Sequence, residues 1–414
     1  MKILYLAAYF KPEVISSSHL ENDLLKEFTK NGIKVQVLCP VPSRNCSAEL
    51  RKKYKKFKTE EMFGGNVCIR RYWAPKERNS TTLKFLRYLW CNLMEILISR
   101  RQKDIDVIYA DSTPPTHGVV GGYLSKKLSK KGRCIPFVYD LQDIFPDSLV
   151  TTGITRKGSL LWKIGRKAED CGYRNAKKII TISNKCKENI ENKGVLPDKI
   201  AVIPNWIDLD AVKPVEKKDN PLFDEYGIDP NKFIVMYAGN IGESQGADII
   251  LDGADLFKDE NDIEFVVFGT GALFENFKKR ANALNNVKVF DILPYDKVSY
   301  VYSLADIGLV ICKKGVGAAG MPSKAASIMA CNTPIVASFD TDSDLAELLE
   351  KSGAGVCVEP ENKELFKEEI EKRYNEWRSG EKTDFNSRDY VKRNLSKEIC
   401  VAKYLREIEN MTFK

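Results

Sequence analysis

Three glycine-rich segments, each placed after an apolar run, are the residues of this sequence best suited to holding an anionic ligand. They are Gly239-Asn240-Ile241-Gly242 with Gln245 following, Gly269-Thr270-Gly271, and the segment from Gly315 to Gly320. Glycine adopts positive φ and lets a ligand approach the backbone closely. Free N–H groups at the start of a helix suit a phosphate or sugar hydroxyls. We therefore predict a nucleotide site whose contacts include Gly239, Asn240, Gly242, Gln245, Gly269, Gly271 and Ile292.

The third segment leads into Met321-Pro322-Ser323-Lys324, which predicts a helix that begins here and runs to about Cys331. Asn332 can take the left-handed position after that helix. A lysine in the first turn lies near the positive end of the helix dipole, which is unfavourable for its charge unless an anion binds beside it. The alternative is a tight loop with a surface lysine. The predicted contacts here are Gly320, Met321, Pro322, Ser323, Lys324 and Ser327, and Lys324 is also the predicted catalytic cation.

Three side chains in the first half could act on a second substrate. Asp143 follows the apolar run Phe137–Leu141, and a carboxylate there could orient or deprotonate an acceptor hydroxyl. Its alternative role is a helix N-cap. His19, near the start of the first helix, and His117, after Ser112-Thr113-Pro114-Pro115, are further candidates on the acceptor side, and His19 could equally be a helix-entry residue.

These candidates must be positioned by two alternating series of strands and helices, which predict two doubly wound parallel sheets. Ligands of such sheets bind beyond the carboxyl ends of the strands. We expect a first domain over residues 1–206, a second over residues 207–386, and a last helix from about 387 to 414 that packs back on the first. The predicted strands are Ile3–Ala8, Lys34–Cys39, Val67–Tyr72, Val107–Ala110, Phe137–Leu141, Lys178–Ile182 and Val202–Pro204, then Phe233–Ala238, Phe265–Gly269, Val287–Phe290, Ile307–Ile311, Pro334–Ala337 and Gly355–Val358.

Composition narrows the class of protein. The 414 residues include 11 cysteines without a CxxC pair and only two histidines, so we expect a reducing cytoplasm, no disulfide framework and no metal site. No apolar run is long enough to span a membrane, and the N-terminus lacks the pattern of a signal peptide. Asp208-Leu209-Asp210 and Asp340-Thr341-Asp342 are interpreted as turns.

The charge is unevenly distributed, with a net charge of +18 for residues 1–200 and −10 for the remainder. An anionic membrane surface or nucleic acid could attract the first half, and no nucleic-acid motif accompanies the charge. Two segments are predicted to contact a membrane: Arg51–Lys58, and the helix Thr81–Lys103 with its apolar middle, Trp90 and flanking cations Lys84, Arg87, Arg100, Arg101 and Lys103. Their alternatives are a solvated basic helix and an ordinary core-packed helix.

The motifs together resemble a family-4 retaining glycosyltransferase of the GT-B fold, most similar to the bacterial group that builds capsule, O-antigen and colanic-acid repeat units. The resemblance covers nearly the whole chain. It is carried by Phe10-Lys11-Pro12-Glu13, Cys39-Pro40, Ser112-Thr113-Pro114-Pro115, Asp143-Ile144-Phe145-Pro146-Asp147-Ser148, Val202-Ile203-Pro204-Asn205-Trp206-Ile207-Asp208, Tyr237-Ala238-Gly239-Asn240-Ile241-Gly242, Ala305-Asp306-Ile307-Gly308-Leu309 and Met321-Pro322-Ser323-Lys324.

The sequence departs from the family pattern at several sites. Ser16, Ser17 and Ser18 replace a Gly-Gly pair near the donor diphosphate, and Ser17 and Ser18 are predicted donor contacts. Ala319 and Ser327 replace two glutamates that in the family contact the sugar and the ribose. Asn240 and Gln245 stand where relatives carry a phosphate-binding Arg/Lys pair, which leaves Lys324 as the predicted cation for the diphosphate. Gln142 replaces the arginine that precedes the aspartate matching Asp143.

The resemblance implies transfer of a sugar from a nucleotide donor to a saccharide on a membrane lipid diphosphate. The expected nucleotide is UDP, and an N-acetylated amino sugar or a deoxy sugar is a candidate for the sugar. The nucleotide-sugar is a substrate, so no cofactor and no metal are expected. The expected location is the cytoplasm, peripheral on the inner face of the cell membrane. Two alternatives remain open: a non-hydrolysing nucleotide-sugar epimerase, and a catalytically silent GT-B protein that binds a partner.

Overall fold

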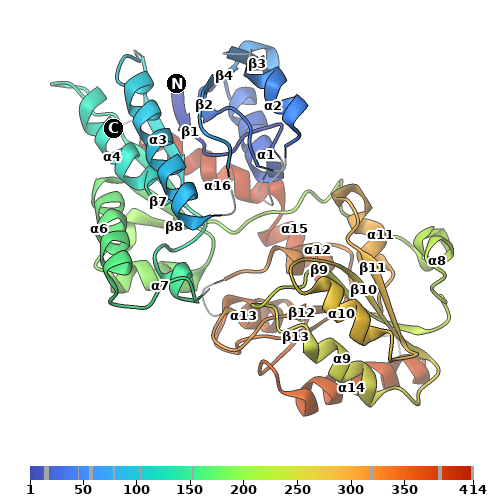
Figure 1. Ribbon diagram of the computed structural model, residues 1–414. Coiled ribbons are helices and arrows are strands. Elements are labelled where there is room, and N and C mark those ends of the chain that lie inside the picture. The colour runs from blue at the N-terminus through green and yellow to red at the C-terminus, as the bar shows by residue number, and fades with distance from the viewer. Residues whose placement is uncertain are drawn as a thin grey trace. The chain divides into compact units, whose positions relative to one another are not determined.

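The computed structural model describes residues 1–13, 18–44, 46–55, 59–77, 80–102, 104–151, 153–317, 320–380 and 385–411. The chain forms two compact units (Figure 1). Unit 1 comprises Met1–Pro204 with Cys400–Lys414, and unit 2 comprises Asn205–Ile399.

Unit 1 is built on a sheet with strand order β3-β4-β2-β1-β5-β6-β7-β8. Neighbouring strands are parallel, except that β3 pairs antiparallel with β4 at the edge. The central strands are almost entirely buried, as expected for a sheet covered by helices on both faces. The strands are β1 (Lys2–Leu6), β2 (Lys34–Pro40), β3 (Thr59–Met62), β4 (Val67–Tyr72), β5 (Val107–Asp111), β6 (Phe137–Leu141), β7 (Lys178–Thr181) and β8 (Ile200–Val202).

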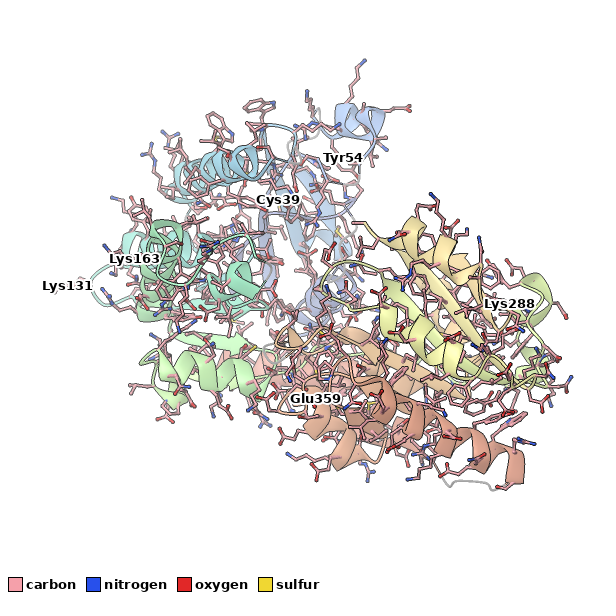
Figure 2. The ribbon with its side chains drawn as sticks, turned by 60° about the horizontal axis from the view of Figure 1, so that its bottom comes forward. Cys39, Tyr54, Lys131, Lys163, Lys288 and Glu359 are labelled. Carbon is pink, nitrogen blue, oxygen red and sulfur yellow. The ribbon has the colours of Figure 1, made fainter. Side chains whose placement is uncertain are left out.

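The helices of unit 1 cover this sheet. In α1, apolar residues recur at helical spacing and are all buried: Leu20, Leu24, Leu25 and Phe28. Figure 2 shows Cys39 in the interior of unit 1 and Lys131 and Lys163 at its surface. The helices are α1 (Ser18–Lys30), α2 (Ala48–Tyr54), α3 (Thr81–Ser99), α4 (His117–Leu128), α5 (Asp147–Thr151), α6 (Leu160–Asn175), α7 (Asn184–Asn192) and α16 (Lys397–Glu409).

Unit 2 contains a parallel sheet with strand order β11-β10-β9-β12-β13-β14. Its strands are β9 (Phe233–Asn240), β10 (Ile263–Thr270), β11 (Val287–Asp291), β12 (Ile307–Ile311), β13 (Ile335–Ser338) and β14 (Gly355–Val358). Its helices are α8 (Leu222–Glu225), α9 (Asp248–Leu256), α10 (Phe274–Ala281), α11 (Val298–Ser303), α12 (Ser323–Ala330), α13 (Asp344–Ser352), α14 (Lys363–Ser379) and α15 (Ser387–Asn394). The prediction of two doubly wound α/β units is therefore confirmed.

The chain end differs from the single helix predicted over about 387–414. The helix divides into α15 and α16 at Leu395-Ser396. In α15, Ser387 Oγ donates to Met329 O at 2.9 Å, which keeps this helix in unit 2. In α16, Glu407 pairs with Lys178 at 3.0 Å, and Tyr404 donates to Asp140 Oδ1 at 3.3 Å. Only α16 therefore packs on unit 1.

Two strands of unit 1 also differ from the prediction. The antiparallel strand β3 was not predicted, because Thr59-Glu60-Glu61-Met62 is mostly polar and lacks an apolar alternation. The last strand, predicted over Val202–Pro204, is β8 (Ile200–Val202).

Candidate functional site

The first two glycine loops lie side by side because β9 and β10 are neighbouring parallel strands. Their register pairs Gly239 with Gly269 and Asn240 with Thr270. Beyond the strands, Ile241 N donates to Thr270 O at 2.6 Å. Ile292 follows the next strand, β11, and its N–H donates to Gly269 O at 2.9 Å. Parallel pairing thus brings the predicted contacts from three strand ends to one edge of the sheet.

Gly271 is required where the two loops meet. Its φ is +125°, and a Cβ there would lie 2.3 Å from Asn240 Oδ1 and 2.7 Å from Ile241 O. A larger residue would therefore push the loops apart.

The first loop is held closed by its own polar side chains. Gln245 Oε1 accepts from Asn240 Nδ2 at 2.9 Å and from Gly242 N at 3.2 Å. Asn240 and Gln245 were predicted as ligand contacts. Here they bond to each other and shape the loop.

Lys324 joins this edge from α12. Its Nζ lies 3.9 Å from the centre of the Tyr237 ring and 2.5 Å from where a Cβ on Gly239 would be. Glycine at position 239 therefore leaves the space that the ammonium group occupies. Among the residues that the structure describes, no carboxylate pairs with Lys324, and desolvation lowers its pKa to about 7. An ammonium group in this setting is stabilised by an anion that binds beside it.

The start of α12 lies next to this cation, and the Ala325 N–H in its first turn donates to Pro322 O at 3.1 Å. The helix begins at Ser323 after Pro322, and no side chain caps it. The N–H groups of its first turn thus add to the positive end of the helix dipole. The helix ends as predicted, with Asn332 in the left-handed region at φ +59°.

The loop before α12 is held by Asp340, a residue that the sequence analysis assigned to a turn. Its two carboxylate oxygens accept from Gly315 N and Gly317 N, each at 2.8 Å. Asp340 follows β13, the neighbour of β12. The carboxylate fixes the path of the loop toward α12.

The remaining predicted contacts of unit 2 lie in and after this loop. Gly320 N donates to Gly317 O at 3.0 Å, Met321 is half-buried against the core, and Ser327 is buried within α12. Ala319 lies outside the described residues.

In unit 1, Asp143 is exposed beyond the carboxyl end of β6. Its N–H donates to Ser112 Oγ at 3.3 Å, which fixes the backbone. Its carboxylate has no hydrogen-bond partner in the described part of the chain, and the nearest helix, α5, begins only at Asp147. Asp143 is thus a free carboxylate rather than an N-cap.

The other unit 1 candidates differ in accessibility. Ser18 and His19 are the first residues of α1 and are half-buried, whereas Ser17 lies outside the described residues. His117 is fully buried, with Nε2 3.3 Å from Glu95 Oε1 and Nδ1 3.5 Å from Asp111 Oδ1. Burial alone would lower the pKa of His117, but these carboxylates raise it to about 10. A buried imidazolium cannot contact an acceptor, so His117 is a structural cation here.

The helix predicted as core-packed or membrane-facing, α3, exposes its apolar side. The exposed residues are Leu83, Phe85, Leu86, Leu89, Trp90, Leu93 and Leu97, and nearby Trp73 is 53% exposed. The rings of Trp73 and Trp90 pack edge to face with their centroids 5.5 Å apart. Core packing therefore does not explain this helix.

Two of the predicted membrane cations are buried instead. Arg51 donates to the backbone oxygens of Val41 and Pro42 at 3.2 and 2.5 Å and to that of Ala74 at 2.6 Å. Arg87 is 1% exposed and donates to Pro75 O at 3.2 Å. Both fix loops inside unit 1, because their long side chains extend inward from α2 and α3. Lys52, Lys53 and Lys55 are exposed, whereas Lys56–Lys58 and Lys103 lie outside the described residues.

Within the described ranges, no cluster of three or more His, Cys, Asp or Glu residues could hold a metal ion. Nor does any described helix have the length and hydropathy needed to cross a membrane.

Comparison with protein families now identifies the chain. The description "Glycosyltransferase Family 4" matches residues 22–211, and "Glycosyl transferases group 1" matches residues 219–391. The chain belongs to the family-4 glycosyltransferases. It is 27% identical over 427 aligned positions to an Escherichia coli (strain K12) protein whose name assigns it, as WcaI, to glycosyl transfer in colanic acid biosynthesis. The alignment covers 99% of this chain and 100% of that relative.

Solved structures show the same fold for this glycosyltransferase. Sucrose-phosphate synthase from Thermosynechococcus elongatus matches with a TM-score of 0.75 at 14% identity, covering 99% of this chain and 98% of that one. Anabaena HepE, solved in complex with UDP, matches with a TM-score of 0.70 at 16% identity, covering 99% and 100%. The two units are therefore those of the GT-B fold.

Proposed function

We propose that this glycosyltransferase moves a sugar from a UDP-linked donor to a saccharide carried on a membrane lipid diphosphate, with retention of the anomeric configuration. The product would serve polysaccharide biosynthesis, as the name of the colanic-acid relative suggests. UDP as the nucleotide is supported by HepE, whose structures contain UDP or UDP-glucose.

The observation that carries the donor half of the proposal is Lys324. It is a cation without an acidic partner among the described residues, placed at the uncapped start of α12 and against Gly239. The oxygens of a diphosphate bound there would accept hydrogen bonds from the ammonium group and from the uncapped start of α12 as the sugar–phosphate bond breaks. Lys324 thus stabilises the leaving group in this scheme.

In the proposed reaction, the acceptor hydroxyl attacks the anomeric carbon on the face that the diphosphate leaves. The bond from that carbon to the diphosphate oxygen breaks, and the hydroxyl proton leaves with the diphosphate or through Asp143. Asp143 orients the hydroxyl, and no nucleophile from the protein is required. The two units then act mainly by positioning substrates and balancing charge.

The acceptor half of the proposal is supported by unit 1. The apolar side of α3 is exposed, together with Trp73, Lys52, Lys53 and Lys55. An exposed apolar and aromatic helix side, in a unit that also exposes lysines on and just after α2, suits attachment to an anionic bilayer. Peripheral attachment of this kind, on the cytoplasmic face, would place unit 1 next to a lipid-linked acceptor.

The experiment is incubation of the protein with a panel of UDP-sugars and a lipid-diphosphate saccharide, followed by mass spectrometry of lipid and nucleotide fractions. A lipid product heavier by one sugar supports the proposal. An isomerised nucleotide-sugar would instead indicate an epimerase, and tight UDP binding without either product would indicate a catalytically silent protein.

A further inference from the structure

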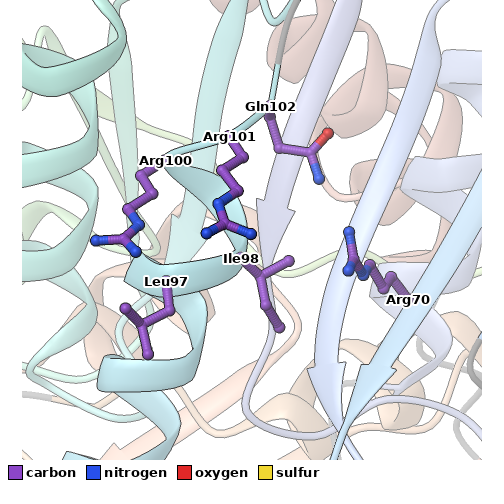
Figure 3. Close-up of a pocket in the computed structure, with 6 residues that line it drawn as sticks. All are labelled: Arg70, Leu97, Ile98, Arg100, Arg101 and Gln102. Carbon is purple, nitrogen blue, oxygen red and sulfur yellow. The ribbon is translucent and has the colours of Figure 1, made fainter.

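A cavity of about 430 Å³ lies at the end of α3, outside the proposed donor and acceptor positions. It is lined by Arg70, Leu97, Ile98, Arg100, Arg101 and Gln102 (Figure 3). Figure 3 shows the guanidinium groups of Arg101 and Arg70 pointing toward one another, from the end of α3 and from β4. The volume of this cavity is within the range of sites that hold a small ligand or headgroup.

The three arginines have no anion of their own. In the part of the chain that the structure describes, no carboxylate pairs with Arg70, Arg100 or Arg101, and all three are exposed. Positive charges that line one cavity favour the binding of an anion among them. Guanidinium groups match phosphate oxygens in paired hydrogen bonds.

The cavity continues the exposed apolar side of α3. Leu97 lines the cavity and is also the last of the exposed apolar residues that recur along the helix at Leu83, Leu86, Trp90, Leu93 and Leu97. From Leu83 to Leu97 the helix rises roughly 21 Å, at 1.5 Å per residue. An anion site that borders such a stripe suits a ligand with a phosphate and an apolar tail.

We infer that this cavity binds the phosphate headgroup of an anionic membrane lipid, while the apolar side of α3 contacts the acyl chains. The arginines hold the headgroup, and Leu97 and Ile98 border its first carbons. The inference rests on the membrane association proposed for unit 1, and it adds a specific lipid site to the general attraction of lysines. A soluble phosphate would contact the arginines but not the exposed apolar side of α3, whereas a lipid would contact both. The lipid is therefore the better match.

The test compares binding of the full-length protein to vesicles of phosphatidylcholine with and without phosphatidylglycerol. In R70Q/R100Q/R101Q we expect the partition onto anionic vesicles to fall about fivefold per arginine, on the order of a hundredfold in total. The matched control is K131Q/K163Q/K167Q, which removes the same charge from exposed positions of unit 1 and should lose less than fivefold. Equal losses in both variants would overturn the site in favour of general charge attraction.

A second variant, R70K/R100K/R101K, keeps the charge and removes the guanidinium forks. Its binding should lie between those of the wild type and the glutamine variant, and wild-type binding would overturn a built phosphate site. Thermal unfolding followed by circular dichroism should give a melting temperature no lower than that of the wild type, because the arginine side chains make no ion pair in the described structure.

Two further measurements separate the possible explanations. Calorimetry with inorganic phosphate should detect no binding at concentrations where vesicles saturate, and tight binding lost in the glutamine variant would assign the cavity to a soluble anion. UDP binding is measured in the same wild-type sample. If vesicle binding depends on the arginines but UDP does not bind, the lipid site is supported and the proposed donor site is contradicted. If UDP binds but vesicle binding does not depend on the arginines, only the lipid site is contradicted.

Discussion

Replacement of Lys324 by Met should weaken UDP binding while it stabilises the ligand-free protein. Methionine has a similar length and no charge, so it removes the ammonium group from the space beside Gly239 with little change in volume. A charge-assisted hydrogen bond in a half-buried site contributes about 1.5–3 kcal/mol. At pH 6, where the lysine is mostly charged, UDP should bind roughly 10- to 150-fold more weakly to the variant.

The pH dependence follows from the pKa of Lys324, which is about 7 in the free protein. A bound diphosphate favours the charged lysine, so the complex holds more protons than the free protein above pH 7. The affinity of the wild type should therefore fall about tenfold from pH 6 to pH 8 as the charged fraction falls. K324M should show only the titration of UDP itself, and the difference between the two profiles isolates the lysine.

Lys324→Met should weaken UDP binding but raise the free energy of unfolding of the ligand-free protein. The pKa of Lys324 is lower in the folded protein than its ordinary value of 10.5, so the unfolded chain binds more protons between pH 7 and 10.5. The free energy of unfolding should rise with pH across this window, and at or below pH 7 the buried charge destabilises the fold. K324M removes this cost, with an upper limit of roughly 4–5 kcal/mol.

Isothermal titration calorimetry with UDP at pH 6 and pH 8, and thermal unfolding without UDP, provide the two readouts. Lys372→Met is the matched control, because Lys372 is an exposed residue of α14. If K324M binds UDP like the wild type at pH 6, Lys324 does not contact the diphosphate and the proposed role of its charge is wrong.

Four further predictions concern other parts of the two units. Gly271→Ala should reduce both UDP affinity and melting temperature, since its Cβ would lie 2.3 Å from Asn240 Oδ1; unchanged values in calorimetry and unfolding would contradict this. Asp143→Asn should lower kcat roughly 10²- to 10⁴-fold in a transfer assay while the Kd for UDP stays constant. A normal kcat would remove Asp143 from the acceptor hydroxyl. His117→Phe should lower the melting temperature most at pH 6, because the raised pKa of about 10 gives a stabilisation that is full below pH 6.5 and lost as pH rises to 10. A pH-independent difference would mean that its charge is irrelevant. Replacing the exposed Lys52, Lys53 and Lys55 with Gln should weaken sedimentation with anionic vesicles about fivefold per lysine, and full sedimentation would make them solvated residues only.

The backbone of the proposed donor site could be predicted from the sequence because glycine and proline constrain the chain locally. The positive φ of Gly239 and Gly271 and the start of α12 at Pro322-Ser323 follow from local conformational preferences, whereas the close approach of Lys324 to Gly239 and of Asn240 to Gly271 depends on the fold. Asn332 in the left-handed region follows in the same way. Lys324 was identified because its charge opposes the helix dipole, which is also a local property.

The side chains that support the site could not be predicted in this way. Asp340 bonds to Gly315 and Gly317, which precede it by about 25 residues, and only the parallel pairing of β12 with β13 brings them together. The composition of a helix likewise does not show which side faces inward. Arg51 and Arg87 were therefore predicted at the surface, and the structure buries both.

The most direct test of the donor site is a crystal structure of the protein with UDP. We expect diphosphate oxygens about 2.7–3.2 Å from Lys324 Nζ and from N–H groups at the start of α12, with Gly239 against the ligand. A diphosphate bound elsewhere, with Lys324 still over the Tyr237 ring and without an anion, would contradict it.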